Sequence, residues 1–278
     1  MAVIDAILNL VCVLLWLNWR SQKFPNPATL SGITLATALR SAGPPATRTW
    51  SSPGMLIAVL LIRAVAYHEI GSAVNWTATL QLGALSLPFR SDRFMRIILF
   101  STLSFGVWLF GCYVWLMLLS VVNRGLPSND PQQRLVRGLL GLAEWWPSAV
   151  KLLMPAMVAA FGWIFVNPLL YKMGLIPASV SEWQLICQAL LLACATCLLW
   201  KYLLVGLFLI HLINSYLYLG NHPVWQYISH SANRLLKPFR ILPLRLVKVD
   251  FAPVIAIPLV LAAAEALALW LPKLYQRL

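Results

Sequence analysis

Three ionisable residues stand inside or beside long apolar stretches of this 278-residue chain: Arg63, Lys201 and Glu265. A charge surrounded by hydrocarbon is costly, so such residues usually pair with one another or face a cavity. One hypothesis is an intramembrane pair, Glu265 with Arg63 or Lys201, that marks a path for ions or protons. The alternative is that the long Lys and Arg side chains reach the membrane surface while Glu265 faces a neighbouring helix.

A second group of charges forms a basic segment near the C-terminal end. Five cations lie within fifteen residues: Arg234, Lys237, Arg240, Arg245 and Lys248. Basic residues next to a membrane are attracted to anionic headgroups by about 1 kcal/mol each, so the segment is predicted to bind anionic lipid or an acidic partner protein. The alternative is that it only orients the chain, because Lys and Arg accumulate on the cytoplasmic side.

Groups that commonly bind metals or carry out catalysis are sparse. Cys194 and Cys197 have C-x-x-C spacing, but they stand in an apolar stretch without the setting of a redox or metal motif. The four His residues lack the paired spacing of metal ligands. The eight acidic residues are scattered and form no catalytic pair. We therefore expect no enzyme, no metal site and no cofactor.

The composition indicates that these residues belong to a membrane protein. Apolar residues make up 60% of the chain and charged residues 10%, against about 25% charged in soluble domains. The net charge of +13 could indicate nucleic-acid binding, but the basic residues flank apolar stretches. Anionic lipid headgroups are therefore the expected counter-charge, and no nucleic acid is expected. Thirteen Trp and eight Tyr agree, because such rings collect at the headgroup level.

Six apolar stretches are long enough to cross the hydrocarbon core. In chain order they are residues 3–19, 54–70, 94–122, 148–170, about 185–219 and 253–271. The predicted fold class is therefore all-α integral membrane, with six transmembrane helices. Two segments between spans, 132–146 and 224–240, are amphipathic at helical spacing and are expected to lie in the membrane surface as interfacial helices.

Prolines divide the chain into three similar units, 1–71, 94–171 and 172–278, with 72–93 as a connector. In each unit an X-Pro pair precedes the segment between the two spans, and a second proline opens the second span. The pairs are Asn26-Pro27, Asp130-Pro131 and His222-Pro223, and the second prolines are Pro53, Pro147 and Pro253. This recurrence predicts three helix-pair repeats.

Asp250 and Pro253 form a helix-entry motif before the last span. The first turn of a helix has unpaired N–H groups, from which a carboxylate can accept hydrogen bonds. Proline suits the same turn because it has no N–H group. We therefore expect the last helix to enter the membrane at this point.

The third unit resembles a known family over about residues 200–265. The matching motifs are His222-Pro223, Leu236-Lys237-Pro238-Phe239-Arg240, Leu242-Pro243 and Asp250-Phe251-Ala252-Pro253 before an apolar helix. They are similar to motifs of the YggT (YlmG) family of small bacterial and plastid membrane proteins. The first two units keep the architecture without the basic motif, and His222 and Ala252 replace the usual Asn and Ser.

The resemblance implies a non-enzymatic multi-pass protein of the bacterial inner (plasma) membrane. The family is linked to osmotic stress and potassium uptake, to cell division and, in plastids, to cytochrome assembly. A scaffold or assembly factor is therefore expected, with anionic lipids, membrane or cytoplasmic proteins and further copies of the chain as partners. The alternative is a transporter or channel component in ion homeostasis that uses the intramembrane charges.

The distribution of Lys and Arg predicts the orientation. Thirteen of the 21 lie in the connectors inside the three units, and six lie on the opposite side. The connectors are therefore expected in the cytoplasm and both termini in the periplasm. Asp5 before the first span and Arg20 after it agree, whereas Arg90, Arg93 and Arg96 oppose this orientation.

Overall fold

The computed structural model describes residues 2–22, 51–74, 77–82, 85–91, 93–126, 130–176, 181–217, 222–238, 245–246, 249–250 and 252–277. Within these residues, six helical segments are long and apolar enough to cross a membrane. They are α1 (Ala2–Gln22), α4 (Ser51–Val74), α5 (Phe94–Val122), α7 (Ser148–Lys172), the successive α8 (Glu182–Ala195) and α9 (Leu198–Tyr216), and α11 (Ala252–Arg277). The prediction of a mainly helical protein with six helices suited to cross a membrane is confirmed. The strands described below were not predicted.

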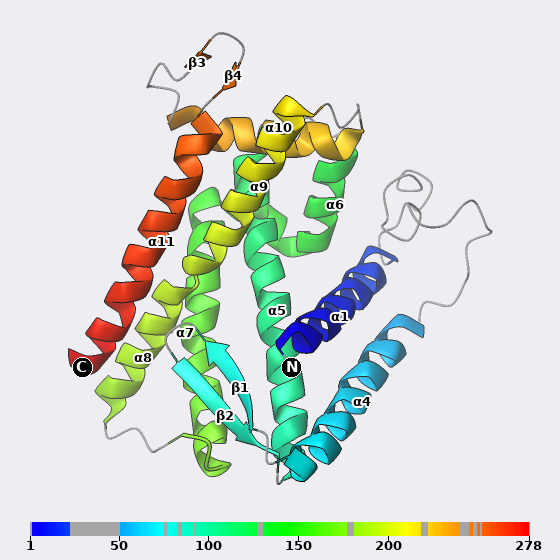
Figure 1. Cartoon of the computed structure of the whole chain (residues 1–278), viewed down its shortest axis with the longest axis vertical. Coiled ribbons are helices and arrows are strands. Elements are labelled where there is room, and N and C mark those ends of the chain that lie inside the picture. The colour runs from blue at the N-terminus through cyan, green and yellow to red at the C-terminus, as the bar shows by residue number, and fades with distance from the viewer. Residues whose placement is uncertain are drawn as a thin grey trace.

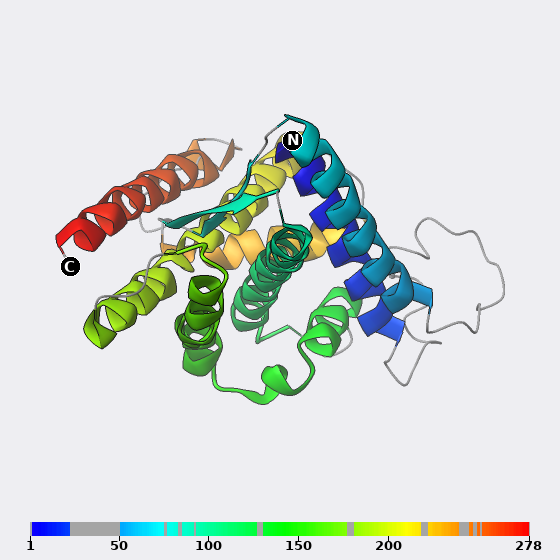
Figure 2. The same cartoon turned by 90° about the horizontal axis from the view of Figure 1, so that it is seen from below.

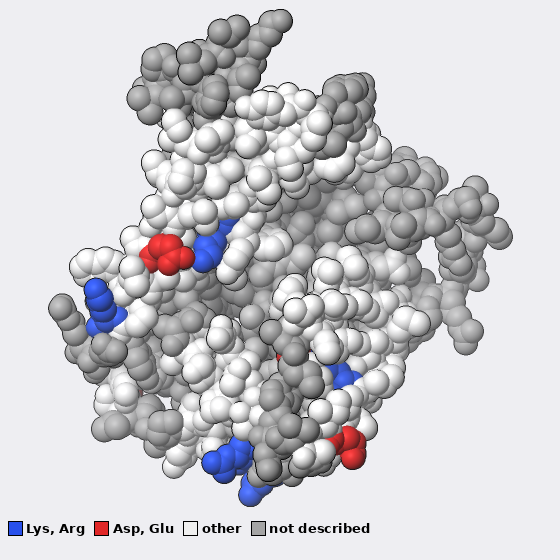
Figure 3. All heavy atoms as spheres, in the orientation of Figure 1, with Lys and Arg blue, Asp and Glu red and all other residues white. Residues whose placement is uncertain are grey.

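The helix α5 is the central element of the bundle. Seen from below, it lies between α1 and α4 on one side and α7, α8 and α11 on the other (Figure 2). Its residues take part in three apolar clusters, through Phe100, Phe105 and Leu116. A fourth cluster, around Phe208, joins α9 to α11. The described surface in Figure 3 is mostly uncharged, as expected of a protein surrounded by lipid.

Two short amphipathic helices, α6 (Pro131–Leu140) and α10 (Pro223–Leu235), lie at one end of the bundle (Figure 1). Both begin at an X-Pro pair. Asp130 Oδ1 accepts a hydrogen bond from the Gln132 N–H at 2.9 Å, and His222 Nδ1 accepts one from the Val224 N–H at 3.3 Å. Each proline then occupies the first helical position, where no N–H is needed. The two X-Pro pairs are thus N-caps of equivalent helices.

The amphipathic segment after Asp130 is shorter than the expected 132–146. Helix α6 ends at Gly141, whose φ of 58° lies in the left-handed region that favours glycine. A 3₁₀ turn, η1 (Gly141–Trp145), follows and turns Leu142 and Trp145 outward, where they are 84% and 88% exposed.

The connector contains a β-hairpin of β1 (Thr77–Leu82) and β2 (Leu85–Arg90). The strands are antiparallel, with Ala78 opposite Phe89 and Leu80 opposite Leu87. These four side chains are buried in the cluster that also contains Phe100 of α5 and residues of α7 and α8. The inner face of the connector therefore belongs to the core.

A second antiparallel pair, β3 (Arg245–Leu246) and β4 (Val249–Asp250), precedes α11. It lies at the same end of the molecule as α10 (Figure 1). One end of the bundle is thus formed by α6, α10 and this ribbon. The opposite end carries the foot of the β1–β2 hairpin, where Thr77 stands opposite Arg90.

Candidate functional site

Arg63 on α4 is paired with Asp5 on α1. Its Nη2 atom lies 2.9 Å from Asp5 Oδ1, and its Nη1 atom donates to Asn9 Oδ1 at 2.7 Å. The Tyr67 hydroxyl donates to the same Asp5 oxygen at 2.7 Å. Arg63 is only 2% exposed, so its charge is compensated almost entirely by protein groups.

The same cluster extends to α5. Asn9 Nδ2 donates to Ser104 Oγ at 2.9 Å. The Arg63 guanidinium carbon also lies 5.1 Å from the centre of the Phe100 ring, within the range of a cation–π contact. Polar and aromatic groups of three spans thus converge on one buried cation, an arrangement that fixes α1, α4 and α5 to one another.

The three intramembrane charges singled out in the sequence do not come together. Arg63 is paired with Asp5 and not with Glu265. Lys201 on α9 has its ammonium group 5.1 Å from the Tyr202 ring centre, and Glu265 on α11 is exposed. Among the residues that the structure describes, no ion pair within 4.0 Å involves Lys201 or Glu265.

A second buried cation, Lys151, lies in the first turn of α7. Its Nζ atom is 2.9 Å from Glu144 Oε2 and donates to Ser120 Oγ at 2.8 Å. Ser120 Oγ in turn donates to Glu144 Oε2 at 2.6 Å, and Arg137 Nε lies 3.5 Å from the other carboxylate oxygen. This group joins α5, α6, η1 and α7. Sequence reasoning missed it, although a lysine at the start of an apolar span is a signal that a partner is needed.

The seam between α5 and α10 is also polar and buried. Asn123 Nδ2, just beyond the end of α5, donates to Ser231 Oγ at 2.7 Å, and both residues are buried. Ser231 Oγ donates to the Tyr227 carbonyl at 2.8 Å. The Tyr227 hydroxyl donates to Gln133 Oε1 of α6 at 3.1 Å, and burial raises the pKa of this hydroxyl to about 12. Three helices therefore meet in one hydrogen-bonded layer.

Arg234, predicted to face lipid or a partner, takes part in this seam. Its Nη1 atom donates to the Val122 carbonyl at 2.9 Å, where the last turn of α5 has unpaired acceptors and the negative end of the helix dipole. A Cβ added to Gly125 would stand 2.8 Å from Arg234 Nη2, so this glycine leaves room for the guanidinium. Arg234 is thus a structural cation in this geometry.

The remaining residues of the basic segment are described unevenly. Lys237 is exposed after α10, while Arg240 and Lys248 lie outside the described residues. Arg245 and Asp250 stand opposite each other in the backbone ladder of β3 and β4. Pro253 is buried in the first turn of α11, the place expected of a helix-entry proline.

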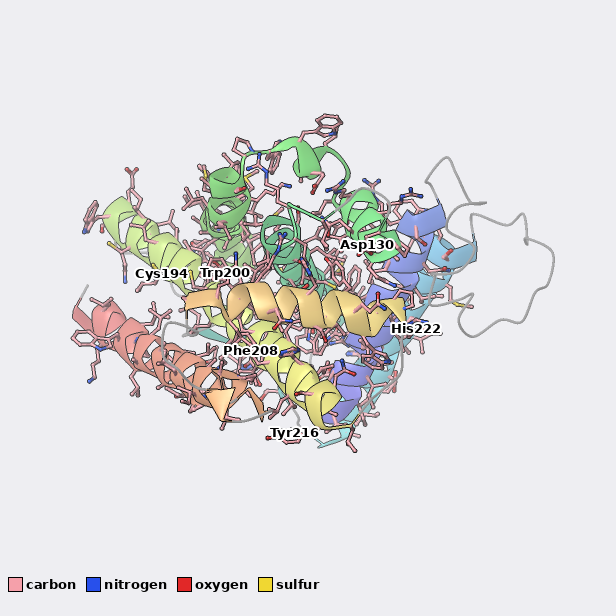
Figure 4. All side chains as sticks on the ribbon, turned by 90° about the horizontal axis from the view of Figure 1, so that it is seen from above. Asp130, Cys194, Trp200, Phe208, Tyr216 and His222 are labelled. Carbon is pink, nitrogen blue, oxygen red and sulfur yellow. The ribbon has the colours of Figure 1, made fainter. Side chains whose placement is uncertain are left out.

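Figure 4 shows the α6 and α10 end from above. Helix α10 lies across the bundle, and α9 runs beneath it from Trp200 through Phe208 to Tyr216. The two N-cap residues, Asp130 and His222, lie toward the same edge of this face. We call α6, η1 and α10 the surface layer. Its buried polar groups bond to one another, to α5 and to Lys151 of α7.

The described part of the chain contains no group of three or more His, Cys, Asp or Glu that could hold a metal ion. Comparison with protein-family models, with curated proteins and with solved structures gives no match to this chain.

Proposed function

We propose that this protein is a non-enzymatic membrane scaffold of the YggT type, whose surface layer lies in the headgroup region and presents basic residues to anionic lipids or partner proteins. The observation that carries the proposal is the buried seam in which Asn123, Ser231 and Arg234 fasten α10 to the end of α5. A helix fastened in this way presents its outer face in a fixed orientation, which a binding surface requires.

The composition of the surface layer supports its interfacial position. Leu142 and Trp145 point outward from η1, next to the ion pair of half-buried Glu144 with buried Lys151. A tryptophan with an adjacent aliphatic residue suits the boundary between headgroups and hydrocarbon. Helix α10 buries Tyr227 and Ala232 and carries exposed Lys237 just beyond its end, a division typical of a helix that lies in the membrane plane.

The closed Arg63 cluster supports a scaffold over a transporter or channel component. A transport path requires charged groups that face a cavity and exchange partners. Both Nη atoms of Arg63 are instead bonded to Asp5 and Asn9 inside the α1, α4 and α5 contact. The cluster is better suited to holding helices together than to passing an ion.

The order of elements supports the three helix-pair repeats. A span, a proline-capped amphipathic helix and a second span follow one another in α5, α6 and α7, and again in α8/α9, α10 and α11. The corresponding segment of the first unit, 23–50, lies outside the described residues. We infer that the three units share one design, placed in a bacterial inner membrane with the surface layer in the cytoplasm.

The proposal is tested by comparing two variants of the full chain in its native membrane. Lys237→Gln combined with Arg240→Gln removes charge from the basic segment, and Glu265→Gln removes the exposed intramembrane carboxylate. We expect cross-linked partner proteins and co-purified anionic lipid to decrease with the first variant and to remain with the second. A solute flux in proteoliposomes that Glu265→Gln abolishes, with partners retained, would favour the transporter instead.

A further inference from the structure

A cavity of about 320 Å³ lies between the hairpin, α5, α7 and the junction of α8 with α9. Its wall is almost entirely apolar and includes Leu80 and Leu87 from the hairpin and Trp163 from α7. This volume is at the lower end of the roughly 300–1,000 Å³ typical of ligand pockets. We call this cavity the hairpin pocket.

Two glycines that line the hairpin pocket stand next to unoccupied space. Gly106 of α5 and Gly162 of α7 both line it, and a Cβ added to either would meet no heavy atom within 4 Å. Both are helical, in interiors where glycine costs about 1 kcal/mol relative to alanine. Their small size therefore leaves a space between the helices that larger residues would fill.

The length of the hairpin pocket matches one leaflet of a bilayer. Along α7 the lining runs from Val158 to Leu170, roughly 18 Å at a rise of ~1.5 Å per residue. Half of a ~30 Å hydrocarbon core is about 15 Å. The pocket begins close to Lys172, the last residue of α7, and ends near the middle of the spans. A single extended hydrocarbon chain has this length and this chemistry.

Basic residues stand at the ends of the helices beyond the outer end of the hairpin pocket, outside its lining. Arg93 occupies the N-cap position of α5 without a side-chain capping hydrogen bond, Lys172 is the last residue of α7, and both are exposed. The two helix ends are joined, because Arg96 Nη2 donates to the Met173 carbonyl at 2.8 Å. Arg90 at the foot of the hairpin adds a third exposed cation, against one acidic residue, Asp92, between positions 90 and 96. Figure 3 shows basic side chains at the lower edge of the molecule, with an acidic group farther along the same edge.

We propose that the hairpin pocket binds one acyl chain of an anionic phospholipid, whose headgroup contacts Arg93 and Lys172. The alternation of the hairpin fits this assignment, since Leu80 and Leu87 face the pocket while Thr79 and Ser86 are exposed on the other face. The site lies at the end of the bundle opposite the surface layer and does not depend on the scaffold function.

The test uses the purified full chain in detergent with a phosphatidylglycerol that carries a photoactivatable group in one acyl chain. We expect a saturable covalent adduct, located by peptide mass spectrometry on pocket-lining segments of α5 and α7. Unlabelled phosphatidylglycerol should displace the probe at lower concentration than phosphatidylcholine with the same chains. This experiment on the wild-type protein is decisive by itself. Adducts that do not saturate and that spread evenly over the six spans would overturn the proposal.

Three variants separate the chain site from the headgroup site. Gly106→Leu with Gly162→Leu fills the pocket and should reduce the adduct at least ten-fold. Gly206→Leu on α9 is the matched control, because this helical glycine also meets nothing within 4 Å but does not line the pocket. Arg93→Gln with Lys172→Gln should keep the chain adduct and lower the preference for the anionic lipid by roughly five-fold per residue. An undiminished adduct in the filled pocket would contradict the proposal, as would an unchanged lipid preference.

Discussion

Arg63 and Asp5 are joined across α4 and α1 by an ion pair of 2.9 Å, although 58 residues separate them in the chain. Asp5 also accepts from Tyr67, and Asn9 links Arg63 to Ser104 of α5. The pair therefore stands in a network of polar side chains from three helices, in which Arg63 Nε is buried without a hydrogen-bond partner. Such an arrangement specifies how the three helices pack against one another. Apolar contacts alone specify packing less well, because lipid tails are as apolar as the helix surfaces.

Replacing Asp5 by Asn should destabilise the protein strongly. The change removes the negative charge but leaves the Arg63 guanidinium buried, a situation that costs about 3–5 kcal/mol in buried pairs. We expect the double variant Asp5→Asn with Arg63→Gln to recover part of this loss. Unfolding of the purified protein in detergent measures the effect, with Glu265→Gln as the exposed control. An Asp5→Asn variant as stable as the control would show that the pair does not hold the helices.

The seam between α5 and α10 should behave as a coupled pair. Asn123→Ala leaves Ser231 without its donor, and a buried polar group without a partner costs about 1–3 kcal/mol. Because the two residues share one hydrogen bond, the double variant with Ser231→Ala should cost less than the sum of the single variants. Hydrogen exchange of α10 reports the local loss. The control is Lys237→Gln, which is exposed beyond the same helix and should leave the exchange unchanged. If the losses of stability in Asn123→Ala and Ser231→Ala add up in the double variant, the bond between the two residues contributes little.

The stability of the surface layer should decrease on acidification. Burial, and then the nearby Arg234, lower the pKa of His230 below its usual value, while Asp130 opposes this shift more weakly. A folded-state pKa below the unfolded value of about 6.5 means that the unfolded chain binds the proton first. Stability is therefore fully present above pH ~6.5 and is lost as the pH falls from there through the folded-state pKa.

The variants His230→Gln and His222→Asn test this pH dependence. His230→Gln should flatten the stability profile between pH 7.5 and pH 5. His222→Asn keeps a good N-cap for α10 and should retain the wild-type slope. A slope that persists in His230→Gln would assign the titration to another group.

The spans and the helix starts could be predicted from the sequence, because each depends on residues that are neighbours in the chain. The six apolar stretches and the X-Pro pairs that precede α6 and α10 are of this kind. The hairpin was not predicted, although Leu80, Leu82, Leu85 and Leu87 alternate around Gly83, the spacing of strands with one buried face. The Asp5 partner of Arg63 could not be predicted, because the packing of α1 against α4 brings the two together. The hydrogen bond from Arg234 to the end of α5 could not be predicted either, because it depends on how α10 packs against α5.

The orientation of the protein gives the last prediction. Six spans place both termini on one side of the membrane, and Figure 1 shows the start of α1 and the end of α11 away from the end that carries α6 and α10. Because most Lys and Arg lie in the connectors on the α6 and α10 side, this end should be cytoplasmic.

Alkaline phosphatase fused after Leu278 should therefore be active, and green fluorescent protein fused there should be dark. The same two reporters inserted after Leu142 should give the reverse pattern, because this exposed residue belongs to the surface layer. If the fusions at Leu278 instead report a cytoplasmic end, the basic cluster of Arg90, Arg93 and Arg96 has determined the topology. The surface layer would then face the periplasm, where no cytoplasmic partner could reach it.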